Sequence, residues 1–191
     1  NAENVGSMQR FEELGYKTIP STNADRDAAQ QITDIQTLIT KGANGLLISV
    51  GDADAIVPAI EYANDANVPI VAIDEAPASG SIAMIVRADN VKMGELACLE
   101  LGERVEAGTA VITLDGDPVT SNGRDRTNGF NDCMAENYPD VKLVNVATEW
   151  DPAKAAAGIE TAFNQYDNIS GIYNQSDATF FPTILDPLDS L

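Results

Sequence analysis

The feature that most constrains the fold of this chain is a regular alternation of short apolar runs with helical patterns. The runs LLISV and PIVAI are apolar on both faces, as strands of a sheet covered by helices on both sides must be. Strand, helix and strand recur at a spacing of roughly 30 residues, which is typical of βαβ units. The sequence therefore predicts an α/β fold of parallel sheets with flanking helices.

The apolar runs are expected to form strands at residues 16–19, 45–50, 68–73, 82–86, 110–114, 141–146 and 171–173. Helical patterns lie between most of them, at residues 5–14, 32–39, 56–63, 90–105, 121–137, 152–165 and 178–188. Local signals agree with these assignments, because Asp151 is a good N-cap residue and Pro152 suits the first helical position. Gly15, Gly42 and Gly108 stand where helices should end.

The alternation breaks once, between Ile73 and Asn90. Two strand-like runs follow each other there without a helix, and the segment that joins them contains Pro77, Ser79 and Gly80. After Asp89 the alternation of strands and helices starts again. We therefore expect two α/β lobes, one at residues 1–88 and the other at residues 89–191.

The charge balance excludes several classes of protein. The chain has 11 Lys and Arg residues against 30 Asp and Glu residues, a net charge of −19, and no His. Binding of nucleic acid or of an anionic membrane surface needs clustered cations that this chain lacks. Without His there is neither a Ser-His-Asp triad nor a His-ligated zinc site. The glycine-rich nucleotide motifs and the G-x-S-x-G elbow of the α/β hydrolases are also missing.

The two cysteines, Cys98 and Cys133, both fall in expected helices. They could pair as a disulfide in an oxidising compartment. They could instead be small buried thiols, which are common in helices. The sequence leaves both alternatives open.

Candidate binding residues follow the expected strands. Ligands of open parallel sheets bind beyond the carboxyl ends of the strands. The polar or aromatic groups at those ends are Asp52, Asp74, Glu75, Asp115, Asp117, Trp150, Ser176 and Asp177, with Arg126 on the helix after Asp117. Carboxylates accept hydrogen bonds from hydroxyl groups, Arg donates in a fork, and an aromatic face covers the C–H side of a sugar ring. The set predicts a site for a sugar or polyol.

Four of these residues also have a purely structural interpretation. Asp74 could order a tight turn, and Asp177 could cap the next helix. Trp150 could be a core anchor, and Arg126 could pair with Asp125 in a weak surface ion pair. Only their convergence on strand ends favours a ligand site.

Several segments of the chain, taken together in their order and spacing, resemble those of a known protein family. They are ELGYK, DIQTLITKGANGLLIS, DADAIVPAIEYANDANVPIVAID, RADNVKMGELACLELGERV, RDRTNGF, EWDPAKA and YNQSDAT. With them the chain, from about Asn1 to Leu188, resembles the type I periplasmic solute-binding proteins of ABC transporters, in their ribose-binding branch. The resemblance implies a two-lobed protein with Rossmann-like lobes that closes on a sugar in the cleft between them.

The resemblance also assigns roles to single residues. In the family, the Asp at the end of the PIVAID strand hydrogen-bonds sugar hydroxyls, and here that residue is Asp74. The next position is often a ligand-binding Arg, but here it is Glu75. The Arg of the R-x-x-G-F pattern is Arg126, and the aromatic residue before D-x-x-K-A, expected to stack on the sugar, is Trp150. The family's Asn-Asp pair becomes Ser176 and Asp177.

The implied function is to bind a small neutral sugar or polyol and to deliver it to an ABC transporter permease. No enzymatic activity, cofactor, metal or nucleic acid is expected. The implied location is the periplasm, or the cell exterior with a lipid anchor, and the full-length protein is expected to be a monomer. The family's first strand and its later strands are expected before Asn1 and after Leu191, so the fold should be incomplete at both ends.

Two alternative functions remain at this point. The effector-binding domain of a LacI-type repressor shares this fold, although a net charge of −19 opposes approach to DNA. A metal-dependent α/β enzyme could use Asp74, Glu75, Asp115 and Asp117 as cation ligands. It is disfavoured because the expected lobe boundary separates Asp74 from Asp115.

Overall fold

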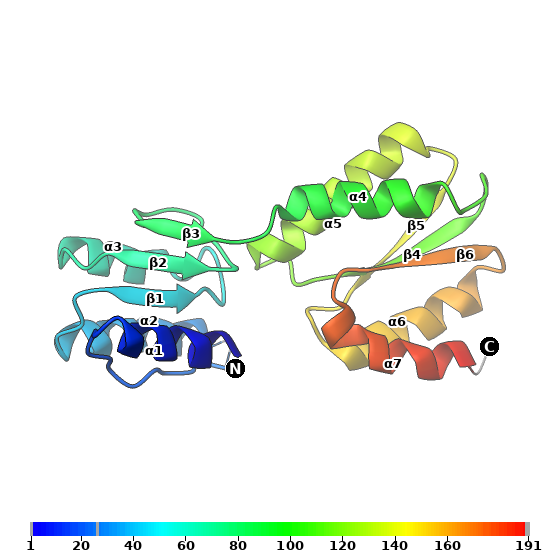
Figure 1. Cartoon of the computed structure of the whole chain (residues 1–191). Helices are drawn as coiled ribbons and strands as arrows, with labels where there is room; N and C mark the ends of the chain where they lie inside the picture. The colour runs from blue at the N-terminus through cyan, green and yellow to red at the C-terminus, as the bar shows by residue number, and fades with distance from the viewer. Residues whose placement is uncertain (1, 26, 190–191) are drawn as a thin grey trace. The chain divides into compact units, whose positions relative to one another are not determined.

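The computed structural model describes residues 2–25 and 27–189. The chain divides into two compact units, residues 1–86 and 87–191 (Figure 1). Each unit contains a three-stranded parallel sheet with helices packed on it. The predicted α/β fold with two lobes is confirmed, and the division falls between Val86 and Arg87.

The first unit has its strands in the order β1-β2-β3, and all three are parallel. Its elements are α1 (Ala2–Glu13), α2 (Ala28–Thr40), β1 (Leu46–Ser49), α3 (Val57–Asp65), β2 (Ile70–Ile73) and β3 (Met84–Val86). No helix separates β2 from β3, as the break in the sequence alternation predicts. The polar segment 74–83 makes this connection instead.

The core of the first unit lies between its sheet and two of its helices. Alternate residues of β1 and β2, including Leu46 and Ile70, are buried. They pack with Ile35 of α2, with Ile56 directly before α3, and with Ile60 of α3. This core places the carboxyl ends of β1 and β2 side by side, with Ser49 opposite Ile73.

The strand expected at residues 16–19 does not form, so this prediction was wrong. The reason is local, because the segment starts with the end of a helix. Gly15 adopts a left-handed φ of 78°, and the Tyr16 N–H donates to the Phe11 carbonyl (3.0 Å). The Tyr16 ring packs edge-on against the Phe11 ring, with centroids 6.1 Å apart. Tyr16 therefore ends α1 instead of starting a strand.

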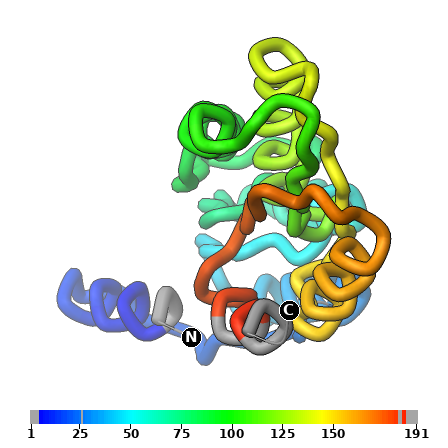
Figure 2. Tube along the Cα trace, turned by 90° about the vertical axis from the view of Figure 1, so that its right-hand side faces the viewer, coloured from blue at the N-terminus to red at the C-terminus, as the bar shows by residue number. Residues whose placement is uncertain are grey.

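The second unit has its strands in the order β5-β4-β6, again all parallel. Its elements are α4 (Asn90–Gly102), β4 (Ala110–Asp115), α5 (Ser121–Asn137), β5 (Lys142–Ala147), α6 (Pro152–Gln165), β6 (Ile169–Asn174) and α7 (Asp177–Asp189). Figures 1 and 2 show α4 and α5 on one side of this sheet, with α6 and α7 on the other.

Strand β4 lies at the centre of the second unit and is buried on both faces. Val111 packs with Phe130 and Cys98 on the side of α4 and α5. Ile112 packs with Ile159 and Phe180 on the side of α6 and α7. A strand covered in this way should be largely apolar, which explains the run AVITL, where Thr113 is the one polar residue and accepts a hydrogen bond from Asn145.

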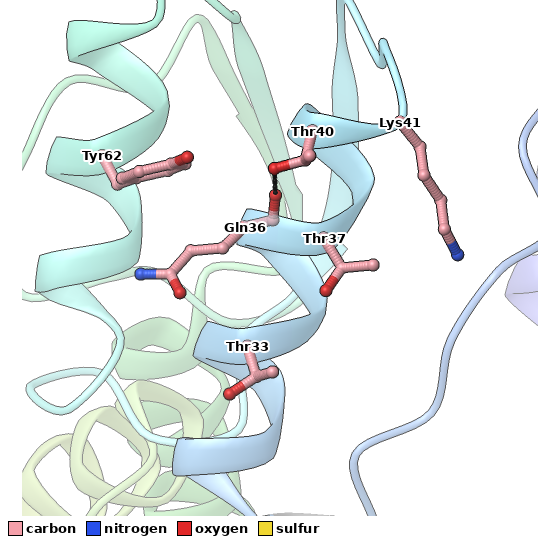
Figure 3. A pocket seen from close by; sticks show the side chains of 6 residues that line it. All are labelled: Thr33, Gln36, Thr37, Thr40, Lys41 and Tyr62. Carbon is pink, nitrogen blue, oxygen red and sulfur yellow. Dashed lines mark hydrogen bonds between the residues drawn. The ribbon is translucent and has the colours of Figure 1, made fainter.

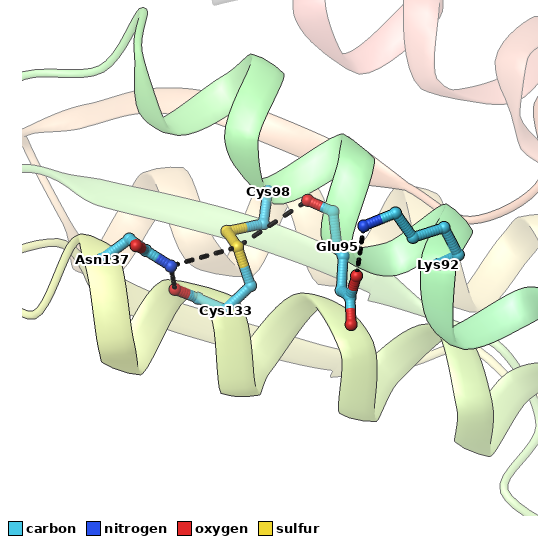
Figure 4. Close-up of a disulfide and its surroundings, with 5 residues drawn as sticks. All are labelled: Lys92, Glu95, Cys98, Cys133 and Asn137. Carbon is cyan, nitrogen blue, oxygen red and sulfur yellow. Dashed lines mark hydrogen bonds and ion pairs between the residues drawn. A yellow bond between two sulfur atoms is a disulfide. The ribbon is translucent and has the colours of Figure 1, made fainter.

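Helices α4 and α5 are joined by a disulfide between Cys98 and Cys133, whose Cα atoms are 6.2 Å apart (Figure 4). Of the two alternatives that the sequence leaves open, the structure therefore contains the disulfide. Figure 4 also shows the ion pair between Lys92 and Glu95 on α4, with Nζ 2.7 Å from Oε2. The bridge joins the C-terminal half of α4 to the C-terminal half of α5.

No helix within the described part of the chain is both long enough and apolar enough to cross a membrane.

Candidate functional site

Arg126, on the second turn of α5, is held at the carboxyl edge of the second sheet. Its Nε donates to Asn90 Oδ1 at 2.8 Å, and its Nη1 donates to the Gln175 carbonyl oxygen at 2.9 Å. Asn90 is the first residue of α4, and Gln175 follows the end of β6. Three segments distant in sequence therefore meet at one guanidinium. Arg126 Nη2 makes no hydrogen bond within residues 2–25 and 27–189.

Trp150 lies beside Arg126, since the guanidinium carbon is 5.9 Å from the centre of the indole ring. The indole Nε1 donates to Thr120 Oγ1 at 3.3 Å. The ring also covers Gly116, where a Cβ atom would lie 2.2 Å from an indole carbon, and it stacks on Phe180 with centroids 6.2 Å apart. Trp150 is half-buried, so part of the ring belongs to the core and part remains accessible.

The backbone around Trp150 is strained. Glu149 and Trp150 both have positive φ angles, 52° and 59°. Residues other than Gly, Asn and Asp rarely adopt positive φ angles. Where they do, they often lie at binding sites. The conformation is held by Thr148, whose hydroxyl accepts from the Trp150 N–H (3.2 Å) and donates to the Asp115 carbonyl (2.6 Å).

A polar network centred on the buried Gln175 ties together the segments around these two residues. The Gln175 side chain accepts from the Gly116 N–H (3.0 Å) and donates to Asp115 Oδ1 (3.2 Å) and Thr127 Oγ1 (2.7 Å). Asn145 donates to the other Asp115 oxygen at 3.0 Å. Burial raises the pKa of the Asp115 carboxyl, and the hydrogen bonds from its neighbours oppose this change. The network ties the end of β4 to α5 and to the loop after β6.

Ser176 and Asp177 lie at the start of α7. The Ser176 hydroxyl is 2.9 Å from the Thr179 hydroxyl, and the Ser176 N–H donates to Asn174 Oδ1 at 3.0 Å. Asp177 is exposed and accepts a hydrogen bond from Asn174 Nδ2 at 3.0 Å. Both residues follow Gln175 in the chain, but their contacts in the structure are those of a helix start.

Asp74 and Glu75 belong to the first unit, directly after β2. Asp74 has a φ of 65°, and its N–H donates to the Val86 carbonyl at 2.9 Å. Asp74 is half-buried, whereas Glu75 is 7 % exposed. Within the described residues, the Asp74 carboxylate has no hydrogen bond or ion pair. A left-handed backbone that presents a free carboxylate at a strand end suits recognition of hydroxyl groups.

Other carboxylates at strand ends have local partners. Asp52 Oδ1 accepts from the N–H groups of Asp54 and Ala55. Asp117 Oδ1 accepts from the Val119 N–H, and Asp151 caps α6. These carboxylates order the turns that follow the strands. In the described part of the chain, no group of three or more His, Cys, Asp and Glu side chains is arranged to hold a metal ion.

A hollow lies between α2 and α3 of the first unit (Figure 3). Its lining consists of Thr33, Gln36, Thr37, Thr40, Lys41 and Tyr62. The hydroxyls of Thr33 and Thr40 donate to carbonyls of their own helix. Because these hydroxyls already serve the helix, the hollow offers fewer groups to a ligand than the edge of the second sheet.

Sequence reasoning missed Asn90 as a residue of this cluster, and it passed over Gln175 in favour of Ser176 and Asp177. The signal for Gln175 was its place between the end of β6 and the start of α7. For Asn90 no comparable signal exists, because it stands at the start of a helix 36 residues before Arg126. Its role depends on how closely α4 and α5 pack.

Comparisons with known proteins agree on one family. The family described as "Periplasmic binding protein domain" matches residues 4–184. The ribose import binding protein of Bacillus subtilis is 31% identical over 175 residues, which cover 90% of this chain and 55% of that protein. The chain thus spans about half the length of this curated relative.

Solved structures show the same fold. A periplasmic solute-binding protein of an ABC transporter from Actinobacillus succinogenes, with bound D-allose, has a TM-score of 0.84 at 22% identity, covering 99% of this chain and 68% of the other. The myo-inositol binding protein of Caulobacter, bound to myo-inositol, has a TM-score of 0.82 at 23% identity, covering 97% of this chain and 65% of the other.

Proposed function

The chain belongs to the periplasmic binding protein domain family, and from this premise we propose that its protein binds a small neutral sugar or polyol and delivers it to an ABC transporter permease. The relatives named above are binding proteins for ribose, D-allose and myo-inositol. Family membership supports a location in the periplasm or outside the cell. We propose further that it acts without enzymatic activity and as a monomer.

The observation that carries this proposal is the pairing of Arg126 with Trp150. A guanidinium with two of its nitrogens held by the protein still presents N–H donors to hydroxyl oxygens. The half-buried indole beside it offers an apolar face to the C–H side of a ring. A sugar or polyol combines these two surfaces in one small molecule.

We propose that Asp74 and Glu75 of the first unit, and Ser176 and Asp177 of the second, complete the set of ligand residues. Asp74 supports this assignment because its half-buried carboxylate has no protein partner in the described residues. Glu75 stands where the family often has Arg, so it adds negative charge to a chain whose net charge is already −19. An anionic sugar would be repelled, and a neutral ligand fits this charge balance.

The test is a thermal-shift screen of the full-length protein against D-ribose, D-allose, D-apiose and myo-inositol, followed by calorimetric titration of each compound that shifts the melting temperature. A ligand that binds only the folded state raises the melting temperature by mass action. Arg126→Lys should weaken binding of the same compound by about tenfold, because a point charge cannot replace a fork of donors. If no neutral sugar or polyol shifts the melting temperature, the proposed function is wrong.

A further inference from the structure

We propose that Asn44 deamidates spontaneously and that the isoaspartate formed there disturbs the start of β1. The sequence contains three Asn-Gly pairs, at residues 44–45, 122–123 and 128–129. Glycine after Asn favours deamidation, because it has no Cβ atom that obstructs approach to its backbone nitrogen. The structure leaves only the first of the three pairs open to this reaction. The reaction needs no ligand and is independent of the proposed function.

The only co-reactant is water. The backbone nitrogen of Gly45 loses its proton and forms a bond to Cγ of Asn44, while the bond from Cγ to Nδ2 breaks and ammonia leaves. Water then opens the cyclic imide at one of its two carbonyl carbons. Opening at Cγ gives aspartate, whereas opening at the main-chain carbonyl carbon gives isoaspartate, in which the main chain runs through Cβ and Cγ. One ammonia is lost and one water is gained, and nothing is oxidised or reduced.

The pair Asn44–Gly45 is accessible and without restraint. Both residues are exposed and lie in the bend between α2 and β1. Within residues 2–25 and 27–189, neither the Asn44 side chain nor the Gly45 N–H makes a hydrogen bond. No atom lies within 4 Å of the position that a Cβ atom would take at Gly45. The Gly45 nitrogen can therefore approach the Asn44 side chain without breaking a contact.

The pair Asn122–Gly123 is protected by burial and hydrogen bonds. Asn122 is 4 % exposed, and its Oδ1 accepts from Asn90 Nδ2 at 2.7 Å. The Gly123 N–H donates to the Thr120 hydroxyl at 3.2 Å, at the start of α5. Attack by the Gly123 nitrogen would break both hydrogen bonds and unwind the first turn of the helix.

The pair Asn128–Gly129 is protected by its helix, although Asn128 is exposed. Both residues lie inside α5, where backbone N–H groups donate to carbonyls one turn earlier. Gly129 is buried against α4, and a Cβ atom at this position would meet the Val91 carbonyl oxygen. Local opening of α5 must precede the reaction. This pair is therefore a matched internal control, with an exposed Asn and a restrained backbone.

Isoaspartate at position 44 would lie between two fixed points of the chain. The Ala43 N–H donates to the Leu38 carbonyl at the end of α2 (3.0 Å), and the Leu46 N–H donates to the Pro69 carbonyl (2.9 Å). Residues 44 and 45 alone must absorb the additional main-chain carbon. Leu46 is a core residue of the first unit and begins the pairing of β1 with β2. The modified chain should therefore be less stable.

The first experiment keeps the full-length protein in warm, mildly alkaline buffer and follows the three Asn-Gly peptides by mass spectrometry after proteolysis. Conversion at Asn44 should be at least about tenfold faster than at Asn122 and Asn128. Gly45→Ala fits the structure, because Gly45 has open space and no positive φ. It should slow conversion at Asn44 at least about tenfold, since its Cβ obstructs the attack. Equal rates at the three pairs, or an unchanged rate in Gly45→Ala, would overturn the deamidation site.

The second experiment measures the effect on β1. Anion exchange isolates the aged fraction that carries one additional negative charge, and its melting temperature is compared with that of Asn44→Asp. This variant has the same charge without the additional main-chain carbon, and it should melt within about 1 °C of the parent. The aged fraction should melt about 2–5 °C below the parent. Equal melting temperatures for the aged fraction and Asn44→Asp would overturn the disturbance of β1. Neither measurement depends on which sugar the protein binds.

Discussion

At the scale of single residues, Trp150 combines two environments. Its indole packs on Gly116 and Phe180 within the second unit, yet the residue is only half-buried and lies 5.9 Å from the Arg126 guanidinium. Loss of the ring should therefore affect both binding and stability. A residue that acts only in the core would affect stability alone.

Trp150→Ala should weaken binding of the sugar by about 1–3 kcal/mol, because the stacking area on its C–H face is lost. The same change should lower the free energy of unfolding by about 2 kcal/mol through the core contacts. Trp150→Phe keeps an aromatic face but loses the Nε1 donor to Thr120, so it should recover most of the affinity. Calorimetric titration and chemical denaturation measure the two effects. Unchanged affinity in Trp150→Ala, with a large loss of stability, would assign Trp150 to the core alone.

Tyr173 leads to a prediction of how the stability of the protein changes with pH. Its ring is 8 % exposed and stacks on Phe130 with centroids 4.0 Å apart. Burial raises the pKa of its phenol from 10.0 to about 12; the Arg126 charge opposes this shift and the Asp115 charge adds to it. Because the pKa of Tyr173 is higher in the folded than in the unfolded state, its contribution to the free energy of unfolding is fully present below pH 10. This contribution is lost as the pH rises toward 12.

The expected loss at high pH is about 2–3 kcal/mol, since each pKa unit corresponds to 1.36 kcal/mol. Denaturation of the parent and of Tyr173→Phe should be compared below pH 10 and near pH 12. The parent should lose more stability than the variant over this interval, because the variant has no phenol at this position. Equal losses in the two proteins would show that Tyr173 ionises without a cost to the fold.

The sequence located part of the candidate site and missed the rest for a physical reason. Arg126 and Trp150 could be predicted because strand ends share one edge of a parallel sheet. Asn90 and Gln175 contact Arg126 across 36 and 49 residues of chain. Such contacts depend on helix packing and on hydrogen-bond geometry, which no local pattern encodes.

At the scale of elements, most strands and helices could be predicted because their signals are local. The apolar run AVITL predicted β4, and Asp151 with Pro152 predicted the start of α6. The segment 16–19 could not be judged in this way. Its apolar residues suit a strand, but the Tyr16 N–H donates to the Phe11 carbonyl at the helix end that Gly15 forms. Here the local helix cap prevails over the preference of the apolar residues for a strand.

The contact between α4 and α5 leads to a prediction for Gly94→Ala. The added Cβ atom would meet the Arg126 carbonyl oxygen, so the helices must separate, at a cost of about 1–3 kcal/mol. Sugar affinity should fall as well, because Asn90 moves away from Arg126. Gly6→Ala is the matched control, since it lies in α1 with no atom within 4 Å of its Cβ position. It should stabilise the helix by about 0.5–1 kcal/mol. A Gly94→Ala variant as stable as the parent would contradict the close packing.

At the scale of the whole molecule, negative charge dominates. The ion pairs found in the described residues are partly exposed and involve Arg10–Glu13, Arg87–Asp125, Lys92–Glu95, Arg104–Glu100 and Lys154–Glu149. Exposed pairs of this kind contribute little stability. With 30 acidic against 11 basic residues, carboxylates outnumber their possible partners. Repulsion among them should oppose the compact state.

The resulting prediction concerns salt. Raising NaCl from about 10 mM to about 150 mM shortens the screening length from about 30 Å to about 8 Å. The repulsion should weaken, and the melting temperature should rise by about 2–5 °C. The affinity for a neutral sugar should change less than about twofold over the same range, because a ligand without charge feels no screened attraction or repulsion. Calorimetry measures both quantities. An affinity that rises steeply with salt would show that the ligand is an anion, which contradicts the ligand class proposed from Glu75 and the net charge. A melting temperature that falls with salt would show that attractive ion pairs outweigh the repulsion among the excess carboxylates.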